Sequence, residues 1–342
     1  MNILVTGIGG FIGYHLAKNL INNNYKVIVI DNLNPYYDVN LKKNRLKELK
    51  IYLKNDISKY SNDNLIFYKV DISNNTEIQK IFLENKIDAI CHLAAQAGVR
   101  YSIKKPEAYI ESNILGFQNV IEACRKYKIK NFSYASSSSV YGGNQNLPFS
   151  EKDRVDTPIS LYAATKKSNE LVAYTYSHLY GIQTTGLRFF TVYGPWGRPD
   201  MALFLFVKAL LNNKPIDVYN NGKMLRDFTF IDDIVGGIIK VIQNPAKTPL
   251  EKSEFNPTKA PYKIYNIGNN SPTKLMDFIS AIEHILNKKF DINYMAIQPG
   301  DVPKTFANID TLVNDFNYRP STPIIEGVEK FIKWYLKYYK IK

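Results

Sequence analysis

The sequence predicts an α/β fold: a doubly wound parallel sheet followed by a smaller C-terminal α/β domain. Up to residue 190, short apolar runs alternate with helical patterns, which is typical of parallel strands joined by crossover helices. The first apolar run leads directly into a glycine-rich turn, as in nucleotide-binding β-α-β units. The alternation then ends, and residues 189–233 and 273–342 are richer in proline, tyrosine and loop patterns. These later segments are expected to form the second domain.

Each element of the sheet domain is predicted from its own residues. Residues 2–6 are apolar and predict a first strand, residues 7–13 predict a glycine turn, and residues 15–22 have helical spacing. Further strands are expected where apolar residues run together, at 26–30, 66–70, 89–93, 131–136 and 183–190. Further helices are expected at 76–84, 106–127 and 160–180. The polar stretches 50–64 and 246–263 are predicted surface insertions.

Length and composition exclude several classes of protein. The chain has 342 residues, of which 45% are hydrophobic, enough for a buried core and for two joined domains. Its longest strongly apolar stretch, 201–211, contains Lys208 and is much shorter than the roughly 20 residues that span a bilayer. The N-terminal residues lack a signal pattern, so a cytoplasmic protein with no membrane partner is expected. Cys91 and Cys124 lie in apolar segments, which favours buried thiols in a reducing compartment.

The net charge of +13 raises the question of nucleic-acid binding. Only 8 of the 44 basic residues are arginine, and the lysines are scattered rather than gathered in one stripe. This pattern favours an ordinary solvated surface, so no nucleic-acid partner is expected. The four histidines are dispersed without ligand spacing, so no metal is expected. The few arginines are more informative, because a guanidinium can bind a carboxylate or phosphate with two parallel hydrogen bonds.

Three glycines predict a dinucleotide site. Gly7, Gly10 and Gly13 lie between the first strand and the first helix, where they permit a tight turn and let a pyrophosphate approach the helix N-terminus. Asp31 closes the second strand 18 residues after Gly13. Its carboxylate can accept hydrogen bonds from ribose hydroxyls and disfavours a 2′-phosphate. The pattern therefore predicts NAD as the cofactor, in preference to NADP.

Residues at the ends of later strands complete the predicted cofactor site. Asp71 and Ile72 follow the third strand, where they can meet the adenine, although a helix or turn cap is an equal interpretation of Asp71. Small residues follow the fourth strand and leave room for the cofactor. The full set of predicted cofactor contacts is Gly7, Gly10, Phe11, Ile12, Gly13, Asp31, Asn32, Asp71, Ile72, Leu93, Ala94, Ala95, Asn113, Tyr162 and Lys166.

A tyrosine, a lysine and a run of serines predict catalytic chemistry. Tyr162 and Lys166 are four residues apart in a predicted helix, so both side chains lie on one face. Residues 136–139, all serine, end the preceding strand. A lysine ammonium and a positive nicotinamide both favour the phenolate, which lowers a tyrosine pKa from about 10 toward neutrality. Tyr162 is the predicted base, supported by Lys166, with Ser137 or Ser139 as the hydroxyl that shares the substrate proton.

Several motifs carry a resemblance to a known family. They are the glycine turn 7–13, the serine segment 136–142, Tyr-Ala-Ala-Thr-Lys at 162–166, the long run 186–201 that contains Tyr-Gly-Pro-Trp-Gly-Arg-Pro-Asp, Arg-Asp-Phe at 226–228, and Pro-Gly-Asp-Val-Pro at 299–303. The last three are the most specific, and the match covers nearly the whole chain. On these motifs the chain resembles the extended short-chain dehydrogenase/reductase family of nucleotide-sugar enzymes. Within that family it is most similar to the NAD-dependent UDP-glucuronate 4-epimerases.

The resemblance implies a domain organisation and an activity. It implies a Rossmann domain that binds NAD, at 1–187 with about 229–268, and a UDP-sugar-binding domain at 188–228 and 269–342. The implied reaction is 4-epimerisation of a UDP-hexuronic acid through a transient 4-keto sugar, in supply of polysaccharide synthesis. The resemblance also implies a homodimer through the helices near 106–127 and 160–180.

A uronic acid substrate adds a requirement, because its 4-keto form is a β-keto acid that can lose carbon dioxide. Arg198 and Thr191 are the candidates that would hold the carboxylate, with a loop ion pair as the alternative for Arg198. Arg226 and Asp301 resemble the family's contacts to the UDP phosphates and ribose. Arg100 is a candidate contact to the phosphates or sugar, with a surface role as an equal alternative.

Related activities are distinguished by one short segment. The family's 4,6-dehydratases have an Asp-Glu pair where this chain has Ser138 and Ser139, and its UDP-glucuronate decarboxylases have a glutamate in that pattern. Both activities are therefore disfavoured. UDP-glucose or UDP-N-acetylglucosamine 4-epimerase is the main alternative, and a catalytically silent NAD-binding protein is the alternative from another class.

Overall fold

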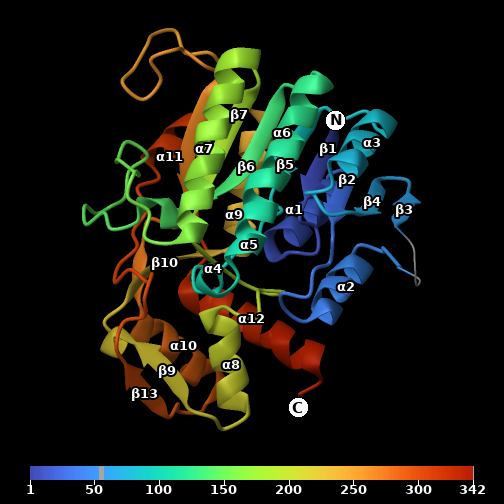
Figure 1. The fold of residues 1–342 in the computed structure, drawn as a ribbon. Coiled ribbons are helices and arrows are strands. Elements are labelled where there is room, and N and C mark those ends of the chain that lie inside the picture. The colour runs from blue at the N-terminus through green and yellow to red at the C-terminus, as the bar shows by residue number, and fades with distance from the viewer. Residues whose placement is uncertain (54–57, 342) are drawn as a thin grey trace. The chain divides into compact units, whose positions relative to one another are not determined.

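An eight-stranded sheet runs through the first unit of the chain, with helices packed against it (Figure 1). The structure is a computed structural model and describes residues 1–53 and 58–341. The strand order is β11-β7-β6-β5-β1-β2-β4-β3. The pairs β1–β2, β1–β5, β2–β4 and β5–β6 are parallel, whereas β3 runs antiparallel to β4. The strands are β1 (Asn2–Thr6), β2 (Lys26–Asp31), β3 (Lys59–Asn62), β4 (Leu65–Lys69), β5 (Ala89–His92), β6 (Asn131–Ser137), β7 (Gln183–Phe189) and β11 (Tyr262–Ile267). The predicted doubly wound parallel sheet is confirmed.

Helices connect these strands. They are α1 (Phe11–Asn22), α2 (Val39–Glu48), α3 (Asn75–Glu84), α4 (Tyr101–Lys104), α5 (Pro106–Tyr109), the π-helix η1 (Ile110–Gly116), α6 (Phe117–Lys126), the 3-10 helix η2 (Ser138–Tyr141), α7 (Leu161–Tyr180) and α9 (Ile231–Gln243). A buried cluster that includes Ile28, Ile90, Phe117 and Phe132 packs the sheet against α3, α6 and α7. Apolar side chains from both layers fill this interface, and their burial stabilises the parallel sheet.

The ends of α7 follow directly from its sequence. The Ser160 hydroxyl accepts a hydrogen bond from the Ala163 N–H at 3.1 Å and caps the first turn. Gly181 ends the helix in the left-handed region, at φ 61°, which glycine adopts without steric cost. The helix predicted at 160–180 is therefore confirmed.

The structure corrects three local predictions. Residues 106–127 are helical throughout but not one α-helix, because seven residues form the π-helix η1 between α5 and α6. The predicted insertion 50–64 contains β3, which pairs with the edge strand β4, and its residues 54–57 lie outside the described part of the chain. Helix α2 was not predicted at all, because its residues are mostly polar and its apolar spacing is weak.

The second unit contains two small sheets and several helices. Strands β8 (Thr191–Tyr193), β10 (Leu225–Phe230) and β12 (Pro272–Lys274) form one sheet, and β9 (Ile216–Tyr219) pairs with β13 (Ile292–Met295) in the other. The helices are α8 (Ala202–Leu211), the 3-10 helix η3 (Asn220–Gly222), α10 (Leu275–Leu286), α11 (Asp310–Phe316) and α12 (Ile324–Tyr339). Phe228 stacks on Phe278 with ring centroids 4.2 Å apart. The fully buried Asp227 carboxylate accepts backbone N–H groups of Asn269, Asn270 and Ala307, which joins three segments.

The observed units differ from the predicted domain bounds mainly at two places, and by a few residues at two others, since Arg188 lies in the first unit and residues 266–268 lie in the second. The first unit comprises Met1–Asn144, Glu151–Arg188 and Val235–Tyr265, and the second comprises Gln145–Ser150, Phe189–Ile234 and Asn266–Lys342. Gln145–Ser150 was predicted in the first domain, but Phe149 exchanges backbone hydrogen bonds with Phe306 and Asn308 of the second unit. Residues 229–234 also belong to the second unit, since β10 pairs with β8.

Within residues 1–53 and 58–341, no helix has both the length and the apolar character that crossing a membrane requires. The same residues contain no group of three or more metal-ligating side chains. Cys91 and Cys124 are both buried and unpaired, and burial raises the pKa of each thiol.

Candidate active site

The glycine turn between β1 and α1 leaves no room for side chains. A Cβ on Gly13 would lie 2.2 Å from the Gly7 carbonyl oxygen, and one on Gly7 would lie 2.8 Å from the Ala94 nitrogen. Gly7 also has φ 82°, a conformation that favours glycine. Gly10 is the N-cap of α1 and supplies no side-chain cap, and the first turn, which begins with Phe11 and Ile12, has no acidic residue. The turn and the helix N-terminus therefore suit a phosphate group.

Asp31 lies at the end of β2 beside this turn. One carboxylate oxygen accepts the Gly9 N–H at 2.8 Å and the other accepts the Leu33 N–H at 2.7 Å. Each carboxylate oxygen can accept more than one hydrogen bond, so ribose hydroxyls can still bind there. The two backbone donors hold the carboxylate in place for that role.

Asp71 and Asn32 lie together after two neighbouring strands. The Asn32 amide donates to Asp71 at 2.6 Å, and the Ser73 N–H and hydroxyl donate to the other Asp71 oxygen at 2.9 and 2.8 Å. Burial raises the pKa of Asp71, but the hydrogen bonds from Ser73 and Asn32 outweigh burial and leave this pKa below its usual value. Asp71 therefore has the turn-capping role that the sequence allowed. The Ile72 side chain is buried and fills the space that a side chain on Gly116 would need.

Arg45 of α2, which was not predicted as a site residue, supports the glycine turn. Its guanidinium is fully buried and donates to the Gly9 carbonyl and to the Tyr37 hydroxyl, each at 2.6 Å. On α2, Leu41, Arg45 and Leu46 are all buried, at positions one turn apart or adjacent. Arg45 therefore lies on the apolar face of α2, and this position could indicate a buried arginine. The face can be identified only after the segment is recognised as a helix.

Thr6 and His92 position the loop after β5, which contains Leu93, Ala94 and Ala95. The Thr6 hydroxyl oxygen accepts the N–H groups of Leu93 and Ala94 at 3.1 and 3.0 Å, and it lies 3.0 Å from His92 Nδ1. Because the oxygen already accepts twice, we assign its proton to Nδ1 and the neutral Nε2–H tautomer to His92. Burial, and secondarily the Lys166 charge, lowers the pKa of His92 to about 3.

We expect His92 to make the protein sensitive to acid. Its pKa is about 3 in the folded state, below the value near 6.5 of an unfolded chain, so the unfolded state binds more protons between these pH values. The free energy of unfolding should then fall below pH 6.5, by about 2 kcal/mol at pH 5. Urea unfolding at pH 7 and pH 5 measures this fall. His92→Asn should show a fall smaller by that amount, and an equal fall in both proteins would refute the assignment.

The π-helix η1 places Asn113 in a buried polar network. The Asn113 amide oxygen accepts the Gln96 N–H at 2.8 Å, and its nitrogen donates to the Gln96 carbonyl and the Thr165 hydroxyl, both at 3.0 Å. Asn169 of α7 donates to the Asn113 carbonyl at 2.6 Å. Both amide hydrogens of Asn113 are thus used within the protein. Asn113 thereby joins the loop after β5 to α7, and its predicted contact with the cofactor stays a prediction.

The predicted catalytic residues gather where β6, η2 and α7 meet. Lys166 is buried, and its Nζ donates to the Ala135 carbonyl of β6 at 2.9 Å. Burial lowers the pKa of Lys166 to about 7. Tyr162 lies one turn earlier on α7 and is half-buried, with its ring 6.0 Å from that of Tyr109. The buried Ser137 hydroxyl accepts the Ser139 N–H at 3.2 Å, which turns the chain from β6 into η2.

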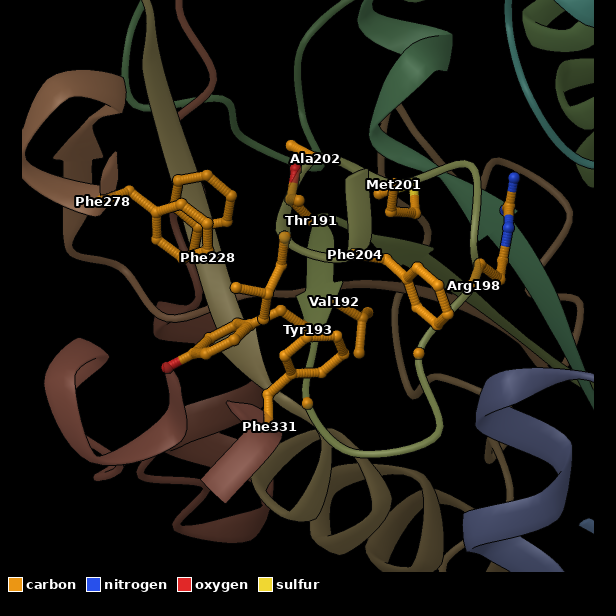
Figure 2. A pocket seen from close by; sticks show the side chains of 13 residues that line it. Thr191, Val192, Tyr193, Arg198, Met201, Ala202, Phe204, Phe228, Phe278 and Phe331 are labelled. Carbon is orange, nitrogen blue, oxygen red and sulfur yellow. The ribbon is translucent and has the colours of Figure 1, made fainter. Parts of the chain in front are cut away.

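In the second unit, Thr191 and Arg198 line a small, largely aromatic pocket (Figure 2). The Arg198 guanidinium points away from the rings of Tyr193 and Phe331. It forms a two-pronged ion pair with Asp200, with Nε and Nη2 at 3.0 and 2.5 Å from the two carboxylate oxygens. The loop ion pair that the sequence allowed for Arg198 is therefore present.

Of the other predicted substrate residues, Arg226 and Asp301 lie in neighbouring segments, whereas Arg100 lies in the other unit. Arg226 of β10 donates to the Pro303 carbonyl at 3.2 Å, and Asp301 lies in a turn closed by its N–H on the Gln298 carbonyl at 3.1 Å. These two residues therefore belong to neighbouring segments of the second unit. Arg100 is exposed at the start of α4 in the first unit.

Known proteins resemble the chain over its whole length. The family model described as "NAD dependent epimerase/dehydratase family" matches residues 3–268. Protein CapI of Staphylococcus aureus is 54% identical, over 99% of this chain and 100% of that protein. UDP-glucuronate 4-epimerase 2 of Arabidopsis thaliana is 43% identical, over 99% of this chain and 77% of that protein. The crystal structure of UDP-glucuronic acid 4-epimerase from Bacillus cereus, in complex with UDP-glucuronic acid and NAD, matches with TM-score 0.86 and 33% identity, over 99% of this chain and 100% of that one.

Proposed function

Because the chain belongs to the NAD-dependent epimerase/dehydratase family, we propose that it is an isomerase that converts UDP-glucuronate to UDP-galacturonate by NAD-dependent 4-epimerisation. One observation carries this function: the first unit combines a side-chain-free glycine turn and Asp31 with Tyr162 and Lys166 on one face of α7. The similarity to a UDP-glucuronic acid 4-epimerase solved with UDP-glucuronic acid and NAD supports the same conclusion.

The residues of the first unit fit NAD. The turn at Gly7, Gly10 and Gly13 is a cradle that any Cβ would fill, and it ends at the uncapped N-terminus of α1, which suits the pyrophosphate. Asp31 is held by two backbone N–H groups and would accept the adenosine ribose hydroxyls. NAD held by these residues would supply reversible hydride transfer at C4 of the sugar, which is the redox chemistry that a 4-epimerisation needs.

The protein's own residues handle the proton and the orientation of the sugar. Tyr162 takes the proton of the 4-hydroxyl when the 4-keto sugar forms and gives it back when the product forms. Ser137 or Ser139 shares this proton by a hydrogen bond to the same oxygen. Lys166, in its charged form, stabilises the phenolate, and the Ala135 carbonyl fixes the direction of its Nζ. Because burial brings the pKa of Lys166 to about 7, the charged form depends on anionic groups nearby, such as the phenolate itself.

The uronic acid carboxylate must be held so that decarboxylation of the 4-keto sugar is disfavoured. We propose Arg198 and Thr191 for this role, with Arg226 and Asp301 binding the UDP portion. The Asp200 carboxylate already pairs with Nε and Nη2 of Arg198, so a substrate carboxylate would use the remaining Nη edge or displace Asp200. The ion pair with Asp200 thereby orients the Arg198 guanidinium before the substrate binds.

The arrangement at η2 disfavours the related activities. Ser138 and Ser139 supply hydroxyls at this segment. The 4,6-dehydratases and the decarboxylases of the family have acidic side chains there. UDP-glucose 4-epimerase remains the alternative, since it uses the same tyrosine, lysine and serine chemistry without a carboxylate contact. We further propose that the enzyme works in the cytoplasm, supported by the two buried free thiols, and supplies polysaccharide synthesis.

The direct test uses purified protein without added NAD. Separate incubations with UDP-glucuronate and UDP-glucose are resolved by chromatography with mass detection. A UDP-galacturonate product of unchanged mass is expected, which also establishes that NAD is retained. A product lighter by carbon dioxide would indicate a decarboxylase, turnover of UDP-glucose alone would indicate the neutral-sugar epimerase, and no turnover would indicate a silent NAD-binding protein.

Arg198→Ala should separate the two substrates. A charge-assisted hydrogen-bond pair contributes about 1.5–3 kcal/mol, so kcat/KM for UDP-glucuronate should fall at least about 10-fold. For UDP-glucose, which has no carboxylate, the fall should stay within about 3-fold. Steady-state kinetics with both substrates measure this, and Asp200→Asn is the control for the loop ion pair. Equal losses for both substrates would assign Arg198 to the loop alone.

We also propose a homodimer built on η1, α6 and α7. Large apolar side chains are exposed on these elements, including Ile110, Leu115, Leu171 and Leu179, with exposed fractions between 48% and 59%. Leu171→Glu combined with Leu115→Glu should convert the dimer to a monomer, as measured by light scattering. Leu83→Glu on α3, where an exposed leucine lies outside the proposed interface, should leave the dimer intact. A wild-type monomer at working concentration would refute the proposal.

A further inference from the structure

A buried ion pair lies directly beside the catalytic elements of the first unit. Glu170 follows Lys166 by four residues and Tyr162 by eight, so it lies on the same face of α7. Its two carboxylate oxygens accept Nε and Nη2 of Arg188 from β7, each at 2.9 Å. The side chains are only 4% and 2% exposed. A pair this deeply buried must have both partners, since either charge alone would be strongly unfavourable.

The same pair reaches the serine segment from two directions. The Ser136 hydroxyl, at the end of β6, donates to Glu170 at 2.6 Å. Arg188 donates its third nitrogen to the Tyr141 hydroxyl at 3.0 Å, and its guanidinium lies over the Tyr141 ring at 4.9 Å. Ser136 lies immediately before Ser137, and Tyr141 lies two residues after Ser139, so they flank the segment that contains these two serines. The ion pair thus contacts both ends of the segment that carries the candidate hydroxyls.

The serine segment also packs closely against the chain that precedes α7. Gly142 follows Tyr141 with φ 55°, and a Cβ there would lie 2.1 Å from the Thr157 carbonyl oxygen. Thr157 lies three residues before Ser160, the N-cap of α7. The serine segment is therefore held against the stretch that leads into α7 as well as against the helix itself.

We propose that Glu170 and Arg188 are positioning residues that set the hydroxyls of Ser137 and Ser139 against Tyr162. The inference rests on the proposed 4-epimerisation, in which a serine hydroxyl and the tyrosine share one proton. Proton transfer needs heavy atoms within hydrogen-bond distance, so a small displacement of the serine segment lowers the rate of the chemical step. Substrate and NAD binding depend on other residues and should change little.

Tyr141→Phe is the most selective test, because it removes one hydroxyl from Arg188 and keeps the ring. We expect kcat for UDP-glucuronate to fall about 5- to 10-fold, with KM within 2-fold and the NAD content unchanged. Glu170→Gln should lower kcat further, by about 100-fold, and Arg188→Lys should lie between the two variants, since it keeps the charge and loses the two-pronged contact.

Val241→Ala is the matched control for lost stability. Val241 is fully buried in α9, and the neighbouring Ile242 carbonyl accepts the amide of Asn131, at the opposite end of β6 from Ser137. The Val241→Ala variant should have a Tm lowered at least as much as that of Tyr141→Phe, and its kcat should stay within 2-fold of wild type. If kcat in all variants simply followed Tm, the positioning role would be refuted.

A double-variant cycle adds a measurement that lost stability cannot imitate. In a background with alanine at both 137 and 139, the hydroxyls to be positioned are gone, so Tyr141→Phe should change kcat by less than 2-fold. A full 5- to 10-fold loss in that background would overturn the proposal. Turnover of UDP-glucuronate by the wild-type protein tests the proposed function by itself. The ratio of the variant kcat to the wild-type kcat tests the role of the ion pair.

Discussion

Tyr162→Phe is expected to reduce epimerisation of UDP-glucuronate by about 1000-fold while the protein keeps its NAD. In the proposed reaction the phenol exchanges a proton with the sugar 4-hydroxyl, and general acid–base catalysis contributes about 10²- to 10⁴-fold. The ring remains, so its packing against Tyr109, with centroids 6.0 Å apart, is preserved. The rate is measured by chromatography of UDP-glucuronate and UDP-galacturonate, and the NAD content by release from denatured protein.

Tyr174→Phe is the matched control for this variant. Tyr174 lies on the same helix, three turns later, and its hydroxyl is 2.7 Å from that of Thr258, at the exposed surface. Loss of that hydroxyl should leave kcat within 2-fold of wild type. A loss below 10-fold in Tyr162→Phe would contradict its role as the base, and loss of NAD from the variant would point to a binding role instead.

Gly13→Ala should remove NAD from the protein. The added methyl group would lie 2.2 Å from the Gly7 carbonyl oxygen, far inside van der Waals contact, and that oxygen belongs to the backbone and cannot move aside like a flexible side chain. The turn must open, which displaces the N-terminus of α1 from the position where it would bind the pyrophosphate. We expect less than about a tenth of the purified variant to contain NAD, and activity to fall in proportion.

Gly236→Ala makes the same chemical change in helix α9, where an added Cβ has no neighbour within 4 Å. It should retain NAD and keep or raise the thermal stability, because alanine favours a helix by about 1 kcal/mol over glycine. Full NAD content in Gly13→Ala would show that the turn tolerates a side chain and would remove the main support for the cradle.

Much of the fold was predictable because the relevant signals are local. The glycine turn, the Ser160 cap and the Gly181 stop of α7 each depend on residues a few positions apart. The alternation of apolar runs and helical spacing is also read within short windows, and it predicted the parallel sheet. Helix α2 and strand β3 were missed because their residues are mostly polar and they gain order from the β4 edge and from the buried Arg45.

The catalytic assignment was predictable in part. Tyr162 and Lys166 are one turn apart in sequence, so their common face needs no tertiary information. The prediction that the Lys166 ammonium favours the phenolate did not include the burial of Lys166, which lowers its pKa to about 7, or its hydrogen bond to the Ala135 carbonyl of β6. Likewise, the sequence allowed both a substrate contact and a loop ion pair for Arg198, and the structure contains the pair with Asp200.

By itself, the sequence determined the fold class, the glycine turn and the shared helix face of the two candidate catalytic residues on α7. Only the tertiary structure decided the partners of buried polar groups: Glu170 with Arg188, Asn113 with Gln96 and Thr165, and Asp227 with three backbone N–H groups from two distant segments. The physical reason is that periodicity and backbone preference act over a few residues. Which donor meets which acceptor depends on segments that packing brings together from distant parts of the chain.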